Sequence, residues 1–117
     1  MAEVAGTITR VDPGRDTWMV TWLGLGDADT GSVIAMPMGN EKSVQLTGTF
    51  ASATVVLEGS NDGTNFVTLT DPQGNALSAT AAMLEGVAEH TRYIRPSTSG
   101  GSGTDVNVYL FVKGQTT

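Results

Sequence analysis

Oxygen-bearing side chains gather at two places in the sequence, and their types could serve a divalent cation or the hydroxyl groups of a sugar. Asp27 and Asp29 stand two residues apart in a glycine-rich stretch, and residues 60–65 read SNDGTN. Calcium takes about six to eight oxygen ligands, and each cluster alone supplies too few. Because Asn, Asp and Gly also favour turns for backbone reasons, we interpret both clusters as solvated turns and predict no metal site.

The second cluster has the composition of a β-hairpin turn. Two apolar runs, residues 53–58 and 66–70, flank it. Asp62 and Gly63 can supply the corner with positive φ that a tight hairpin requires. The sequence therefore predicts a structural turn at Asn61, Asp62 and Gly63, after which residues 66–70 return beside residues 53–58.

Candidates for catalysis are few. His90 is the only histidine, and the chain has no cysteine. A nucleophile needs an activating base within hydrogen-bond reach, and no Gly-X-Ser-X-Gly motif marks a serine. The missing cysteines also exclude a disulfide, a thiol nucleophile and a cysteine-ligated zinc ion. We predict that the protein is not an enzyme, that it has no catalytic residue or cofactor, and that His90 is a loop residue.

The aromatic residues could serve a core, a sugar-stacking platform or a subunit interface. Trp18 and Trp22 fall on one face of a strand that alternates over residues 17–23. Large aromatics dominate the energetics of cores and of interfaces, so the sequence leaves all three roles open. Tyr93 and Tyr109 can each bury a ring while keeping the hydroxyl at an edge, which suits an interface.

The elements that must position these residues alternate with the period of β-strands. The chain has 117 residues, 15 of them glycine and 39% hydrophobic, and helical periodicity is nearly absent. Apolar and polar runs with turn signals about every ten residues predict an all-β fold, an antiparallel β-sandwich of eight or nine short strands. We expect one domain over residues 16–114, an N-terminal arm or first strand over residues 1–15, and a frayed tail over residues 115–117.

The sequence also makes predictions about several individual strands and connections. Val44 and Leu46 should point inward, and so should alternate residues of the longest strand, residues 105–113. Residues 99–103 read SGGSG and are interpreted as a hairpin loop. Pro96 suggests a strand edge or a strand end, because proline lacks the N–H that a ladder needs.

The charge balance limits the partners. The formal net charge is −6, from twelve acidic against six basic residues. Binding to nucleic acid phosphates requires a basic surface, and an anionic membrane attracts basic segments. The sequence therefore predicts no nucleic-acid partner and no membrane partner. The N-terminal residues have no secretory signal pattern, so we expect synthesis in a host cytoplasm without a signal peptide.

Two segments together carry a resemblance to known proteins. A strand ending in EGSNDGTNF, at residues 58–66, is followed later by RYIRP at residues 92–96, a glycine-rich loop and a long final strand. This order, over residues 53–113, resembles the jelly roll of discoidin-type domains. It also resembles small capsid decoration (cement) proteins of tailed bacteriophages, which are similar in length, acidity and lack of cysteine.

The resemblance to decoration proteins implies a jelly-roll-like sandwich on the virion exterior that stabilises the shell by binding the major capsid protein, as a homotrimer. The discoidin-like order implies the alternative, a carbohydrate-binding module of a phage tail fibre or baseplate. Candidates for the capsid or subunit interface are apolar or aromatic residues of the N-terminal segment, the Trp strand, a Met-Pro-Met loop and two tyrosines: Val4, Ile8, Trp18, Trp22, Met36, Met38, Tyr93 and Tyr109.

Overall fold

The computed structural model describes residues 3–12, 17–35 and 41–114, and these residues contain strands and no helix. None of them forms a helix that is long and apolar enough to span a bilayer. The strands are β1 (Glu3–Val4), β2 (Gly6–Asp12), β3 (Thr17–Leu25), β4 (Thr30–Gly31), β5 (Ile34–Ala35), β6 (Glu41–Thr49), β7 (Ala53–Ser60), β8 (Val67–Thr68), β9 (Ser78–Ala79), β10 (Met83–Val87), β11 (Tyr93–Gly100) and β12 (Asp105–Lys113).

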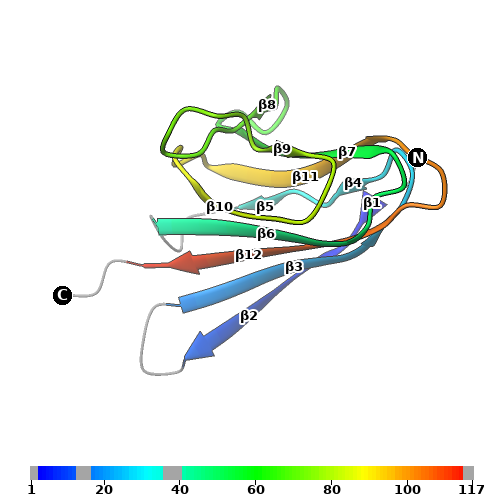
Figure 1. Ribbon diagram of the computed structural model, residues 1–117. Coiled ribbons are helices and arrows are strands. Elements are labelled where there is room, and N and C mark those ends of the chain that lie inside the picture. The colour runs from blue at the N-terminus through cyan, green and yellow to red at the C-terminus, as the bar shows by residue number, and fades with distance from the viewer. Residues whose placement is uncertain (1–2, 13–16, 36–40, 115–117) are drawn as a thin grey trace.

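The strands form two sheets (Figure 1). The five-stranded sheet has the order β10-β6-β12-β3-β2. The seven-stranded sheet follows the path β1-β4-β11-β7-β8, with β5 beside β11 and β9 beside β7. All described pairs are antiparallel except β1 with β4. The prediction of an all-β, mainly antiparallel sandwich is confirmed, and the strand count exceeds eight or nine because two-residue strands alternate too briefly to recognise.

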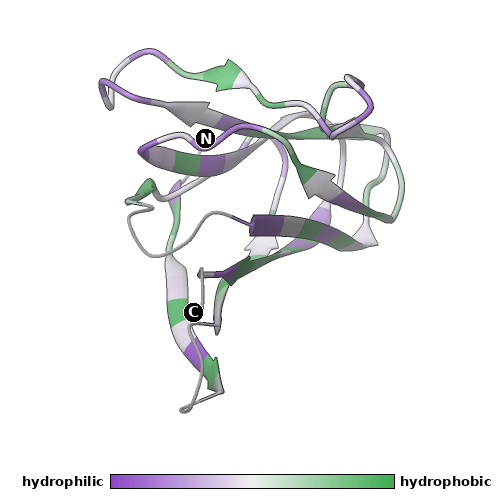
Figure 2. Ribbon diagram, turned by 90° about the vertical axis from the view of Figure 1, so that its left-hand side faces the viewer, coloured by the Kyte–Doolittle hydropathy of each residue, from purple (hydrophilic) through white to green (hydrophobic). Residues whose placement is uncertain are grey.

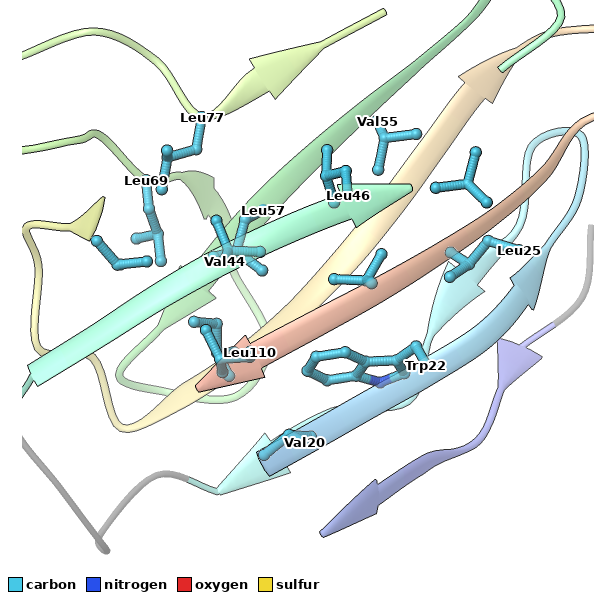
Figure 3. Close-up of a cluster of buried hydrophobic side chains, with 14 of the residues drawn as sticks. Val20, Trp22, Leu25, Val44, Leu46, Val55, Leu57, Leu69, Leu77 and Leu110 are labelled. Atoms are coloured by element: carbon cyan, nitrogen blue, oxygen red, sulfur yellow. The ribbon is translucent and has the colours of Figure 1, made fainter. Parts of the chain in front are cut away.

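The hydrophobic core lies between the sheets, where side chains from both meet (Figure 3). Val44 and Leu46 of β6 are buried, as their alternation predicts. In β12 the inward residues Val106, Val108 and Leu110 are fully buried. Burial of apolar area at about 25 cal/mol per Å² is the main term that holds the two layers together.

One connection differs from its prediction. Residues 99–103 do not form a hairpin loop, because β11 pairs with β7, β4 and β5 in one sheet while β12 pairs with β3 and β6 in the other. The glycine-rich stretch therefore carries the chain from one layer to the other. Gly101 and Gly103 have φ values of +92° and +79°, which other residues adopt only with strain.

Pro96 also differs from its prediction, since it lies inside β11 opposite Leu57 of β7. The strand's other neighbour is divided between β5 and β4, whose register partners are Tyr93, Ile94 and Ser97. No described strand pairs with Pro96 on that side, so the missing N–H is tolerated there.

Residues 3–12 form two strands of the sandwich. β1 pairs with β4, and β2 pairs with β3. Ser32 joins both strands to the seven-stranded sheet, because its N–H donates to the carbonyl of Val4 (2.7 Å) and its hydroxyl oxygen accepts from the N–H of Gly6 (2.8 Å). These contacts make the segment a first pair of strands instead of a detached arm.

Candidate functional site

The SNDGTN turn between β7 and β8 uses its own carboxylate as an acceptor. Oδ1 of Asp62 accepts from the Ser60 hydroxyl and from the backbone N–H groups of Thr64 and Asn65, each at 2.8 Å. Oδ2 accepts from Nδ2 of Asn65 at 2.8 Å. The two backbone bonds, then those from the side chains, hold the pKa of Asp62 well below its usual range. The hydrogen bonds within the turn therefore account for the stabilisation of the ionised Asp62 carboxylate.

The same turn packs against β11. Gly63 has a φ of +79°, and a Cβ added there would lie 3.3 Å from Cε2 of Tyr93. The side-chain oxygen of Asn61 accepts a hydrogen bond from the N–H of Arg92 at 3.0 Å. The half-buried ring of Tyr93 thus lies under the turn, on the seven-stranded sheet.

The Asp27–Asp29 cluster ties connections together. Oδ1 of Asp27 accepts from the N–H of Thr104 at 2.9 Å, and its Oδ2 accepts from the N–H of Gly103 at 3.3 Å. These hydrogen bonds, with the Thr104 side chain adding to them, lower the pKa of Asp27. Oδ2 of Asp29 accepts from the N–H of Gly26 at 2.8 Å. Asp27 therefore fastens the β3–β4 connection to the β11–β12 connection.

Neither cluster has the ligand number of a calcium site, and the described ranges hold no group of three or more His, Cys, Asp or Glu residues suited to a metal ion. We expect the melting temperature to be the same in excess calcium and in excess EDTA. A ligand that binds only the folded state would raise it by mass action. A calcium-dependent rise in thermal denaturation followed by circular dichroism would contradict this expectation.

His90, the only histidine of the sequence, borders a hollow of about 380 Å³. Nδ1 of His90 is 3.3 Å from Nζ of Lys42, an inward residue of β6 that is only 6% exposed. Burial lowers the pKa of Lys42, and the charge of Glu89 partly opposes that shift. The residues that line this hollow include no serine, threonine or cysteine, so His90 has no hydroxyl or thiol partner among them.

A second hollow of about 260 Å³ lies beside the SNDGTN turn. Its one carboxylate, Glu89, accepts from both the hydroxyl and the N–H of Thr70, which lower its pKa. Asn61, Asn65 and Thr91 also border the hollow, but no aromatic ring does. This hollow therefore offers hydrogen-bonding groups and no ring for stacking.

The two tryptophans have different environments, although they share a strand face. Trp22 is fully buried, and its Nε1–H donates to the carbonyl of Ser32 at 3.0 Å. It therefore belongs to the core and presents no ring to a shell or a sugar, which corrects its place among the interface candidates. Trp18 is half-buried, and the guanidinium of Arg10 lies 5.1 Å from its ring centroid.

The remaining interface candidates do not form one surface. Val4 is half-buried against the core, and Ile8 of β2 is 43% exposed. Tyr93 lies on the seven-stranded sheet and Tyr109 on the five-stranded sheet. Met36 and Met38 lie outside the described residues.

One coherent surface emerges from the register of the five-stranded sheet, and we name it the outer face. Its central outward residues form two rows across the strands: Leu84, Gln45, Tyr109, Thr21 and Thr7, and then Gly86, Ser43, Phe111, Met19 and Thr9. The next outward residues along β6 and β12 include the charged Glu41, Lys113 and Asp105. Neither row contains a charged side chain, although the protein carries a net charge of −6. Alternation within β3 and β12 puts Met19, Tyr109 and Phe111 on the face that points away from the core. Only the order in which the strands pair brings these residues side by side.

The fold and these geometries define a two-sheet β-protein with two uncharged rows at the centre of one sheet face. No protein-family model, no curated protein and no solved structure matches the chain.

Proposed function

We propose that the protein is a structural virion protein, a phage capsid decoration protein that binds the outer surface of the shell and stabilises it. The observation that carries this proposal is the pair of uncharged central rows on the outer face of the five-stranded sheet. The resemblance of residues 53–113 to decoration proteins supports it independently. The partner in this proposal is the major capsid protein.

The outer face has the chemistry of an interface centre. Tyr109 and Phe111 are half-buried neighbours on β12, flanked by Met19 of β3. Interface centres are depleted of charge and enriched in aromatic residues and methionine, because burying such groups requires no desolvation of an ion. The acidic residues lie off the two rows, where they could match basic patches on a coat protein.

A charge placed in the outer face tests the proposal. Phe111→Glu should weaken co-sedimentation with expanded, undecorated phage shells by at least about tenfold, because a buried unpaired carboxylate is strongly unfavourable in an interface. Val56→Glu is the matched control, since Val56 is a half-buried, outward residue of β7 in the other sheet. Equal binding by both variants would reject the outer face as the docking surface.

Separate experiments test whether the protein is part of the virion and whether it forms a trimer. Mass spectrometry of gradient-purified virions from the source culture should detect the protein at a stoichiometric level, and its absence from them would contradict the proposed role. The homotrimer that the resemblance implies stays a prediction, which the mass of the protein in solution tests.

A further inference from the structure

A lysine is buried near the start of β6. This end of the molecule lies to the left in Figure 1 and faces the viewer in Figure 2. Lys42 points inward from β6, and its register partners on the two neighbouring strands are the buried Val87 and Val112. Only 6% of Lys42 is exposed. Lysine is rarely buried to this degree unless its amine has a partner.

One partner of this amine is a histidine. Nζ of Lys42 lies 3.3 Å from Nδ1 of His90, a residue that is itself exposed. An ammonium group only donates hydrogen bonds, so Nδ1 accepts from it and the neutral imidazole carries its own proton on Nε2. Both residues also border the hollow of about 380 Å³. The structure therefore brings an amine, a base and a space for a small molecule together.

Burial favours the neutral form of the amine, which is its nucleophilic form. Removal from water lowers the pKa of Lys42, and the charge of Glu89 only partly opposes this shift. Desolvated lysines are the ones that proteins use to form imines with carbonyl compounds. Lys113 provides a comparison, because it is the only other lysine of the sequence and is exposed on the neighbouring strand β12.

We propose that Lys42 is a covalent attachment site for a small uncharged aldehyde, which enters the hollow and forms an imine with Nζ. The lining of the hollow fits this class of compound. Pro72, Val87 and Ala88 provide apolar surface, and the carboxylate of Glu41 disfavours an anion. An aldehyde needs no oxidant, reductant or activating group, since water is the only other product. The site does not depend on the proposed shell-binding function.

The reaction balances with the groups that the hollow contains. The lone pair of the neutral Nζ forms the C–N bond, while the π electrons of the carbonyl group move to its oxygen. Nδ1 of His90 carries a proton from nitrogen to oxygen when the carbinolamine forms, and a second one when the hydroxyl group leaves as water. The nitrogen lone pair then completes the C=N bond, and the imidazole ends in its starting state.

Peptide mapping of the folded protein tests the proposal by comparing the two lysines. Propanal is added at neutral pH with sodium cyanoborohydride, which reduces the imine to a stable secondary amine, and mass spectrometry follows each lysine with time. Lys42 should react at least about threefold faster than Lys113, because burial keeps more of its amine neutral. Equal rates, or a faster reaction at Lys113, would overturn the proposal.

The same reaction in concentrated urea separates the hollow from the local sequence. The preference for Lys42 should disappear there, because unfolding removes both the burial and the nearby imidazole. A preference that persists in urea would contradict the proposal.

His90→Ala tests the proton transfer in the folded protein, since His90 is an exposed residue outside the strands. The reaction at Lys42 should slow by at least about threefold, and the rate at Lys113 should stay the same. An unchanged or faster reaction at Lys42 would contradict the role of His90 as the proton carrier.

Discussion

Replacing Trp22 with alanine should lower the free energy of unfolding by about 3–5 kcal/mol, which is a large part of the ~5–15 kcal/mol that holds a typical domain together. Trp22 is fully buried and is the largest side chain in the core. Its removal leaves a cavity that the surrounding sheets cannot fill, and the carbonyl of Ser32 loses the indole donor.

Two close contacts explain why this site cannot collapse around a smaller residue. A Cβ added at Gly6 would lie 2.6 Å from Nε1 of Trp22, and one added at Gly31 would lie 2.7 Å from its Cδ1. The indole thus fills the space between these two backbones, and Gly31 also lies against the Pro96 ring. The glycines have no side chains that could move into the cavity.

Trp18→Ala is the matched control for this experiment. Trp18 lies on the same strand face but is only half-buried, so its loss should cost about 1–2 kcal/mol. The chain has two tryptophans, so each variant retains one fluorescent reporter for urea denaturation. A smaller loss in Trp22→Ala than in Trp18→Ala would contradict the core assignment.

This pair of residues also shows how far the sequence can predict the fold. Alternation places Trp18 and Trp22 on one face, and that prediction needs only the geometry of a strand. Burial depends in addition on what covers that face. The opposite sheet covers Trp22 and leaves Trp18 partly exposed, and its extent is a property of distant strands that no local pattern contains.

The pairing of strands is nonlocal for the same reason. Residues 99–103 have hairpin composition, yet the chain crosses between layers there, because β11 finds its partner in β7 and β12 finds its partners in β3 and β6. A turn composition indicates a change of direction but not which strand lies alongside afterwards. The outer face could not be assembled from the sequence without that order.

The acidic clusters show the same limit at the level of single hydrogen bonds. The turn composition around Asp62 suggests local bonds, and its donors lie within three residues. The donors to Asp27 lie at Gly103 and Thr104, which are 76 and 77 residues away. Local turn chemistry is therefore visible in the sequence, whereas a bond between two connections requires the fold.

Gly48→Ala should produce the second large effect, a loss of roughly 2–5 kcal/mol of unfolding free energy. Gly48 lies in β6 with a φ of +117°, and an added Cβ would lie 2.3 Å from the carbonyl oxygen of Asp105. That oxygen belongs to β12, which pairs with β6 from Asp105 to Lys113. Neither backbone can move away without disrupting the central ladder of the sheet.

The loss expected for Gly48→Ala has two causes, the conformational strain of a positive φ and the steric contact with β12, and Gly74→Ala separates them. Gly74 has a φ of +89°, but an added Cβ there would have no atom within 4 Å. Its substitution should therefore cost only the conformational strain, about 1 kcal/mol after the reduced entropy of the unfolded chain is included. The difference between the two variants in urea denaturation then measures the contact with β12. Equal losses of unfolding free energy in Gly48→Ala and Gly74→Ala would show that β6 and β12 move apart around the added methyl group at little cost. The ladder between these strands would then not be the rigid centre of the sheet.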